Sequence, residues 1–150
     1  MAHSLYKLTY HCVFSTNGRY PFLKPDILPR VHGYIRGIVR EIDGSLLAIG
    51  GTNDHVHLLM TLPGNLSVAD AMRLIKTKSS KWIHETFPDQ LSFAWQTGYA
   101  AFSVSESAVP SVTNYIRDQV AHHTARSFDE EIRLLAERHG IAFDPRFLEP

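Results

Sequence analysis

Hydrophobic and polar residues alternate over residues 5–15, which predicts a strand. One face carries Tyr6, Leu8, Tyr10, Cys12 and Phe14, and the other includes Lys7, Thr9, His11 and Ser15. A period of two that is rich in aromatic residues is typical of a half-buried strand. Asn17-Gly18 and Pro21 then end the pattern, so we expect a loop after this strand.

Two later segments repeat apolar residues at helical spacing. The apolar residues that recur at helical spacing in the first, over 27–42, are Val31, Tyr34, Ile35, Ile38, Val39 and Ile42. The second is predicted from the N-cap residue Ser67 to about Phe87, with Asp70 three residues after the cap. Both patterns are typical of amphipathic helices that cover a sheet.

The remaining segments are predicted as strands over 46–50, 55–62 and 91–105 and as helices over 110–126 and 128–139. Gly51-Thr52-Asn53-Asp54 between the first two of these strands predicts a β-hairpin. Pro110 suits the first turn of one helix, and Gly140 suits the end of the other.

The order of these elements is β-α-β-β-α-β followed by two helices. It predicts an α+β, ferredoxin-like (RRM-like) sandwich, in which an antiparallel sheet packs against the first two helices. The other sheet face is left for the C-terminal helices or a partner. Because compact domains usually hold about 100–200 residues, we expect one domain over residues 1–150.

Composition narrows the class of protein. Cys12 is the only cysteine, so no internal disulfide can form, which fits a reducing compartment. No run of about 18 apolar residues predicts a membrane span, and the first residues do not resemble a signal peptide. We therefore expect a cytoplasmic protein with no membrane partner. The 15 Lys and Arg balance the 15 Asp and Glu, so binding to nucleic acid requires a local basic patch.

His55-Val56-His57 lies on a predicted strand and is a candidate metal site. Residues i and i+2 of a strand point to one face, about 6.6 Å apart, so the two imidazoles can converge on one cation. The alternative is a pair of histidines that face solvent. Two ligands make a weak site, so the metal hypothesis needs a third ligand.

The third predicted helix supplies a candidate third ligand. Tyr115 and Gln119 are four residues apart and would lie on one face of that helix. An amide oxygen suits Mg²⁺ or Mn²⁺, and a phenol is a candidate nucleophile. His122 and His123 follow near the same face as auxiliary candidates. The alternative for Tyr115 is an ordinary tyrosine of an amphipathic helix.

In combination these motifs resemble a known family. Asp54-His55-Val56-His57-Leu58-Leu59 resembles the HUH (histidine–hydrophobic–histidine) motif of single-tyrosine transposases of the insertion-sequence-200 type, including the REP-associated tyrosine transposases. Residues 115–123 are similar to the tyrosine helix of that family. Residues 11–16, 78–83 and 95–105 match as well, so the resemblance extends from about Tyr6 to Leu148.

The resemblance implies a DNA transposase that cleaves and rejoins single-stranded DNA at hairpin-bearing ends. Tyr115 would be the nucleophile and would form a 5′-phosphotyrosine, while His55, His57 and Gln119 would hold one Mg²⁺ or Mn²⁺. It further implies a homodimer in which the tyrosine helix of one chain completes the site of the other. A phenol is mostly protonated at neutral pH, and no dedicated base is evident from the sequence.

Candidate DNA contacts lie on the second predicted helix and just after it. They are the basic residues Arg73, Lys76, Lys78 and Lys81 and the aromatic residues Trp82 and Trp95. Lysine and arginine bind phosphates, and tryptophans stack on unpaired bases. The alternatives are a solvated helix face for the basic residues and core packing for the tryptophans.

Other classes of function remain open at this stage. A non-catalytic or domesticated protein that binds nucleic-acid hairpins would share the fold. A passive binding module, however, has no use for the set of His55, His57, Tyr115 and Gln119. A metal-dependent hydrolase normally recruits three or more His, Asp or Glu ligands, and no HExxH sequence is present.

Overall fold

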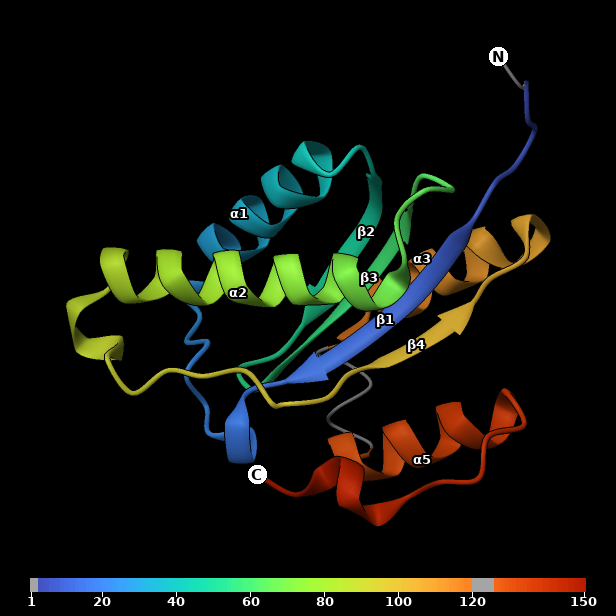
Figure 1. Cartoon of the computed structure of the whole chain (residues 1–150). Helices are drawn as coiled ribbons and strands as arrows, with labels where there is room; N and C mark the ends of the chain where they lie inside the picture. Colours follow the sequence, from blue (N-terminus) through green and yellow to red (C-terminus); the bar gives the residue numbers. More distant parts are fainter. Residues whose placement is uncertain (1–2, 120–125) are drawn as a thin grey trace.

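The computed structural model describes residues 3–119 and 126–150. An antiparallel sheet has the strand order β2-β3-β1-β4 (Figure 1). The strands are β1 Thr9–Ser15, β2 Ser45–Gly51, β3 His55–Thr61 and β4 Ala100–Ser103. The helices are α1 Leu28–Glu41, α2 Val68–Thr86, α3 Val109–Arg117 and α5 Phe128–Arg138. The α+β, ferredoxin-like order predicted from the sequence is confirmed.

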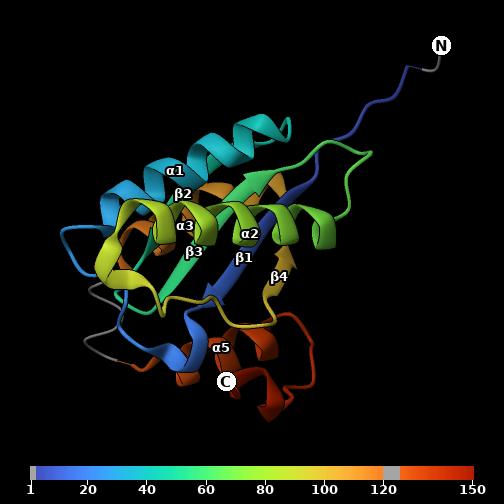
Figure 2. The same ribbon diagram turned by 60° about the vertical axis from the view of Figure 1, so that its left-hand side comes forward.

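Helices cover both faces of the sheet. Helices α1 and α2 lie on one face, and α3 and α5 lie on the other (Figures 1 and 2). Within the described residues, no helix is both long and apolar enough to cross a bilayer.

The main core lies between the sheet and the helices α1 and α2. Phe14 of β1 and Val56 of β3 are fully buried in it, together with Ile35 of α1 and Ile75 of α2. Burial of each such side chain contributes about 1.5–3 kcal/mol. Because Val56 points into this core, the residues on either side of it must point to the opposite face of the sheet.

Strand β1 differs from its prediction in length and in burial. It begins at Thr9, and Leu5, Tyr6 and Leu8 before it are exposed. The predicted half-buried strand is instead buried on both faces, because α3 and α5 cover the side that carries His11 and Val13. A polar residue on that side is therefore enclosed between elements.

The strand predicted over 91–105 is mostly irregular. Only Ala100–Ser103 forms a strand, preceded by a single bridge between Thr16 and Trp95. The Lys76 ammonium donates hydrogen bonds to the carbonyl oxygens of residues 96, 97 and 98 at 2.5, 3.2 and 2.8 Å. Lys76 therefore holds this segment from the side of α2.

The helix predicted over 110–126 ends early. Helix α3 stops at Arg117, where Asp118 has φ −94° and ψ 23°, outside the helical region. Gln119 thus lies beyond the helix that carries Tyr115, and its side chain is buried. The predicted residues 120–125 lie outside the described part of the chain.

Two predicted helix ends are confirmed. The Ser67 hydroxyl accepts a hydrogen bond from the Asp70 amide at 3.1 Å, which caps α2 as expected. Helix α5 ends one residue before the predicted position, and Gly140 follows it with φ 69°, a left-handed conformation that glycine adopts without strain.

Candidate functional site

His55 and His57 project from β3 toward α3 and α5. Both side chains are 0% exposed, and their ring centres are 5.2 Å apart. The prediction that this pair shares one face is confirmed, and the alternative that the two histidines face solvent is wrong. The site is therefore a buried polar cluster, whose members need partners to offset the cost of leaving water.

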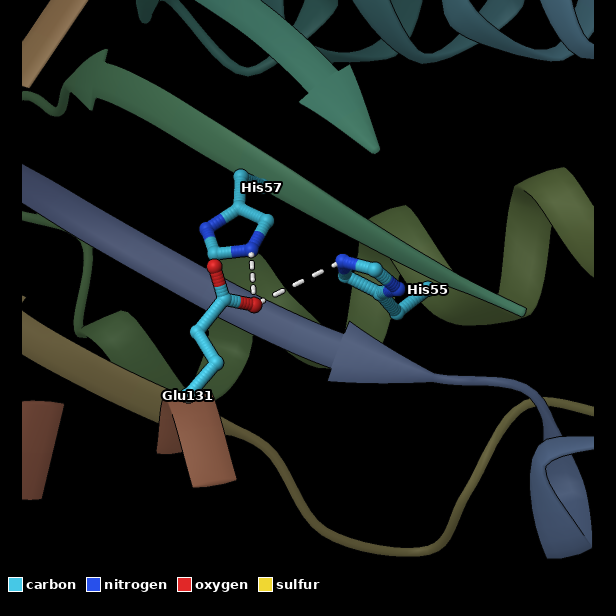
Figure 3. A group of neighbouring side chains, drawn as sticks. All are labelled: His55, His57 and Glu131. Atoms are coloured by element: carbon cyan, nitrogen blue, oxygen red, sulfur yellow. Dashed lines mark hydrogen bonds and ion pairs between the residues drawn. The ribbon is translucent and has the colours of Figure 1, made fainter. Parts of the chain in front are cut away.

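Glu131 of α5 reaches this pair and was not identified from the sequence. Its Oε1 atom lies 3.1 Å from His57 Nε2 and 3.6 Å from His55 Nε2, as Figure 3 shows. The Glu131 side chain is 1% exposed. One sequence signal could have revealed it, because Glu131 occupies the apolar face of α5 beside Phe128 and Leu135. A carboxylate is rarely placed there unless a partner compensates its charge.

Gln119 joins the same cluster. Its Oε1 lies 3.0 Å from His55 Nε2, and its amide nitrogen donates a hydrogen bond to Glu131 Oε2 at 3.1 Å. The second contact fixes the orientation of the amide, with its oxygen toward His55. Gln119 therefore lies where the sequence hypothesis required a third ligand, although the helix predicted to carry it has already ended.

Tyr115 lies beside the histidines of its own chain. Its ring centre is 5.8 Å from that of His57, and its hydroxyl donates a hydrogen bond to Glu131 Oε2. Burial raises the pKa of Tyr115, and the hydrogen bond to Glu131 raises it further. In this arrangement the phenol keeps its proton at neutral pH.

The outer nitrogen of each imidazole is held by a further residue. Asp54 Oδ1 lies 2.8 Å from His55 Nδ1, and the Thr52 hydroxyl donates to the same carboxylate at 3.1 Å. His11 Nε2 lies 2.8 Å from His57 Nδ1. Burial, together with the neighbouring His57, lowers the pKa of His11 to about 3, so His11 is neutral. Such contacts fix ring orientation and direct both Nε2 atoms inward.

The donor set suits a divalent cation. One ligand atom each from His55, His57 and Glu131 can be chosen so that all lie within 4.8 Å of one another. Asp54 holds the outer nitrogen of His55, which leaves Nε2 directed into the cluster. His55 Nε2 faces the oxygens of Gln119 and Glu131, at 3.0 and 3.6 Å. Imidazole nitrogens and carboxylate or amide oxygens are donor types that bind divalent cations.

A cavity of about 300 Å³ opens next to the cluster, between α3 and α5. It is lined by His11, Ser111, Tyr115, Arg138 and His139, among others. Arg138 is exposed, so it brings an accessible positive charge to the side of Tyr115.

The basic residues predicted to contact DNA lie on α2, across the sheet from the histidine pair. A groove of about 800 Å³ runs between α2 and residues 94–99, and Arg73, Lys76 and Lys81 line it. Arg73 and Lys81 are exposed, at 4.0 and 3.9 Å from acidic neighbours on the same helix. Lys78 lies 3.1 Å from Glu41 of α1. Lys76 has a structural role, because its ammonium binds the three carbonyls described above.

The two tryptophans pack inside the protein to different degrees. Trp95 is 8% exposed, and its indole N–H donates to the Ser79 hydroxyl at 2.9 Å, so it is not accessible to a DNA base in this structure. Trp82 is partly buried and stacks on Tyr34 with ring centres 4.5 Å apart. Core packing, the alternative to DNA contact for the tryptophans, therefore describes Trp95 and, in part, Trp82. His122 and His123, the auxiliary candidates, lie outside the described residues.

Comparison with known proteins gives consistent matches. The model of the family described as "Transposase IS200 like" matches residues 4–119. The transposase for insertion sequence element IS200 of Salmonella typhimurium is 27% identical over 126 residues, which cover 80% of this chain and 82% of that protein. The ISDra2 transposase TnpA of Deinococcus radiodurans is 22% identical over 120 residues, covering 77% and 86%.

Solved structures share the fold. A crystal structure of a putative transposase from Deinococcus radiodurans has a TM-score of 0.67 and 24% identity, covering 79% of this chain and 95% of that one. A REP-associated tyrosine transposase bound to a REP hairpin has a TM-score of 0.57 and 16% identity, covering 77% and 70%. The family match ends at Gln119, so α5 and Glu131 lie outside it.

Proposed function

The chain belongs to the IS200-like transposase family, and on this premise we propose that it cleaves and rejoins single-stranded DNA through a covalent bond to Tyr115. The observation that carries the proposal is the meeting of Tyr115, His55, His57 and Gln119 in one buried cluster. His55 and Gln119 are 64 residues apart in the chain. The convergence of a phenol with side chains of metal-ligand type supports a chemical role for this cluster.

The reaction replaces one phosphodiester bond by another. The Tyr115 hydroxyl loses its proton to water and its oxygen attacks phosphorus, the bond from phosphorus to the 3′ oxygen breaks, and the DNA is left with a 5′-phosphotyrosine. The departing 3′ oxygen takes up a proton and becomes a free 3′-OH. A 3′-OH from another end can then attack the phosphotyrosine, which restores Tyr115. No nucleotide cofactor is needed, because the tyrosyl ester is itself a phosphodiester.

His55, His57 and Gln119 are the proposed ligands of a Mg²⁺ or Mn²⁺ ion, which supplies positive charge beside a non-bridging phosphate oxygen when it is bound. The chain supplies the orientation. Asp54 and His11 hold the outer nitrogens of the two rings, so that the inner nitrogens face the same point. The hydrogen bond to Glu131 fixes the direction of the phenol hydroxyl.

The proposed substrate is single-stranded DNA that carries a hairpin. The hairpin bound by the REP-associated relative supports this substrate class. The cavity beside Tyr115, with Arg138 at its wall, gives the scissile phosphate a route to the phenol. The groove beside α2, with Arg73 and Lys81, is proposed as a second surface for the DNA backbone.

Assembly as a homodimer with shared sites stays a prediction of the family resemblance. Within one chain, Tyr115 already lies beside His57. The cluster can therefore form without an exchange of helices between chains. A non-catalytic or domesticated protein that binds hairpins is the alternative, and it would make no use of the phenol.

A covalent-trapping experiment tests the proposal. The protein is incubated with end-labelled single-stranded hairpins, taken from the DNA that flanks its gene, in Mg²⁺ or Mn²⁺. Denaturing electrophoresis should then reveal a protein–DNA adduct for the wild type and for Tyr20→Phe, an exposed control tyrosine, but not for Tyr115→Phe. Binding of the hairpins without any adduct would favour the non-catalytic alternative.

A further inference from the structure

Glu131 occupies the centre of the cluster although it comes from outside the part of the chain matched by the family. Both of its carboxylate oxygens are used. Oε1 faces the two imidazoles, and Oε2 accepts hydrogen bonds from Tyr115 and Gln119. A buried carboxylate that meets polar groups from β3, from α3 and from the segment after α3 is an organised part of the site.

We propose that Glu131 is an anionic ligand of the bound cation, so that cation binding and the docking of α5 on the sheet are one coupled equilibrium. The proposal rests on the proposed function for the existence of a cation site. It adds to that function a fourth ligand and a structural consequence. The C-terminal helix becomes part of the metal site rather than a cover over it.

The charge of the donor set supports the added ligand. His55, His57 and Gln119 are all neutral when they bind a metal, so a divalent ion held by them alone would keep its full charge in a buried place. The Glu131 carboxylate offsets half of that charge, and the ion in turn compensates a carboxylate that is 1% exposed. Since imidazole nitrogens form part of the set, we expect Mn²⁺ to bind more tightly than Mg²⁺.

The remaining contacts of α5 explain why the ligand would matter for docking. Among the described residues, α5 also packs through a small apolar cluster in which Phe128, Ile132 and Leu135 meet Val13 and Phe102. Asp129 adds an ion pair with Arg19, and both side chains are partly exposed. This attachment is much smaller than the main core. A metal–carboxylate bond would therefore strengthen the docking of α5 measurably, since a ligand that binds only the docked form stabilises it.

Mn²⁺ alone, without DNA, tests the inference. Its dissociation constant is measured by isothermal titration calorimetry for the wild type, for Glu131→Gln and for the matched control Glu130→Gln, which removes an exposed carboxylate from the same helix. We expect the constant to rise about tenfold or more in Glu131→Gln and to stay unchanged in the control. A rise of less than about threefold in Glu131→Gln overturns the proposal.

Hydrogen–deuterium exchange tests the coupling between cation binding and the docking of α5. It uses the wild-type protein, so it does not depend on whether a variant folds. Added Mn²⁺ should slow amide exchange in residues 128–138 of the wild type, while exchange in α1 stays unchanged. Unaltered exchange in α5 at saturating Mn²⁺ overturns the coupling. These readouts do not depend on DNA cleavage. If no adduct forms but Mn²⁺ binding depends on Glu131 and slows exchange in α5, only the transposase chemistry is contradicted. If the wild type binds no Mn²⁺, this inference is overturned.

Discussion

Gly50 of β2 lies so close to Ile116 of α3 that a Cβ atom at position 50 would be 2.1 Å from the carbonyl oxygen of Ile116. The backbones of the strand and the helix therefore meet at this point with no side chain between them. Ile116 follows Tyr115 directly in the chain. Close packing at Gly50 is thus one of the contacts that set the position of the candidate nucleophile.

Gly50→Ala should therefore destabilise the protein and displace Tyr115. The added methyl group meets backbone atoms that cannot rotate away, and overpacking of this kind costs about 1–3 kcal/mol. Urea unfolding measures the loss, and the adduct assay should show reduced trapping by the folded variant. Gly37→Ala is the control, because nothing lies within 4 Å of a Cβ at Gly37 in α1, where alanine favours the helix. Equal stability of Gly50→Ala and wild type would contradict the prediction.

Asp54→Asn should weaken cation binding while the fold is kept. The carboxylate of Asp54 accepts the proton of His55 Nδ1, and its charge makes His55 Nε2 a better donor to a metal. Loss of that charge should raise the dissociation constant of Mn²⁺ by about tenfold, as calorimetry can measure. Asp26→Asn, at an exposed position before α1, serves as the control. An unchanged constant in Asp54→Asn would show that the contact has no part in ligand orientation.

Lys76→Met should lower stability. The variant keeps most of the aliphatic stem but removes the donor for three backbone carbonyls in residues 96–98. A lost hydrogen bond to a charged group costs about 1.5–3 kcal/mol, and exposure of this segment to water reduces the cost. Thermal unfolding of Lys76→Met and of the control Lys78→Met, whose ammonium binds an exposed carboxylate on α1, should separate the two roles. A larger loss of thermal stability in Lys78→Met than in Lys76→Met would contradict the structural role of Lys76.

Arg73→Ala combined with Lys81→Ala should weaken binding of single-stranded DNA at every sequence. Both residues line the groove beside α2, and each phosphate that they neutralise adds a released counterion to the salt dependence. In a plot of the logarithm of the binding constant against the logarithm of salt concentration, the slope should become less steep. We expect the slope to change by about 0.7 for each phosphate that is no longer neutralised. Fluorescence anisotropy at several salt concentrations measures this slope. If the slope is that of the wild type, the DNA lies on another surface.

Protonation of His32 should account for part of the stability that the protein loses at acid pH. Burial, with Arg36 nearby, lowers the pKa of His32 to about 4, whereas an unfolded histidine has a pKa of 6.5. Between these values the unfolded state binds more protons, so the free energy of unfolding falls as the pH falls from about 6.5 to 4, by at most about 3 kcal/mol. The stability of His32→Gln should decline less over this range than that of wild type and of the control His3→Gln. If the free energy of unfolding of His32→Gln and of wild type falls equally with pH, His32 has no part in the acid destabilisation.

Local periodicity was sufficient for the order of the elements and for the direction of the histidine pair. A period of two puts His55 and His57 on the same face of a strand wherever that strand is placed. The helical pattern before Gly140 and the cap at Ser67 are likewise short-range features, and both agree with the structure. The family resemblance, which the match over residues 4–119 confirms, rests on these same short motifs.

Other features depend on contacts between distant parts of the chain. The sequence by itself determined the order of strands and helices and the common face of His55 and His57, because period and side-chain direction act over a few residues. Only the tertiary structure decided that Glu131 joins the histidines, that α3 ends before Gln119, and that Trp95 and Lys76 serve the packing of the protein. Most of these outcomes depend on which partner satisfies a buried polar group. That partner comes from another element, so no local pattern specifies it.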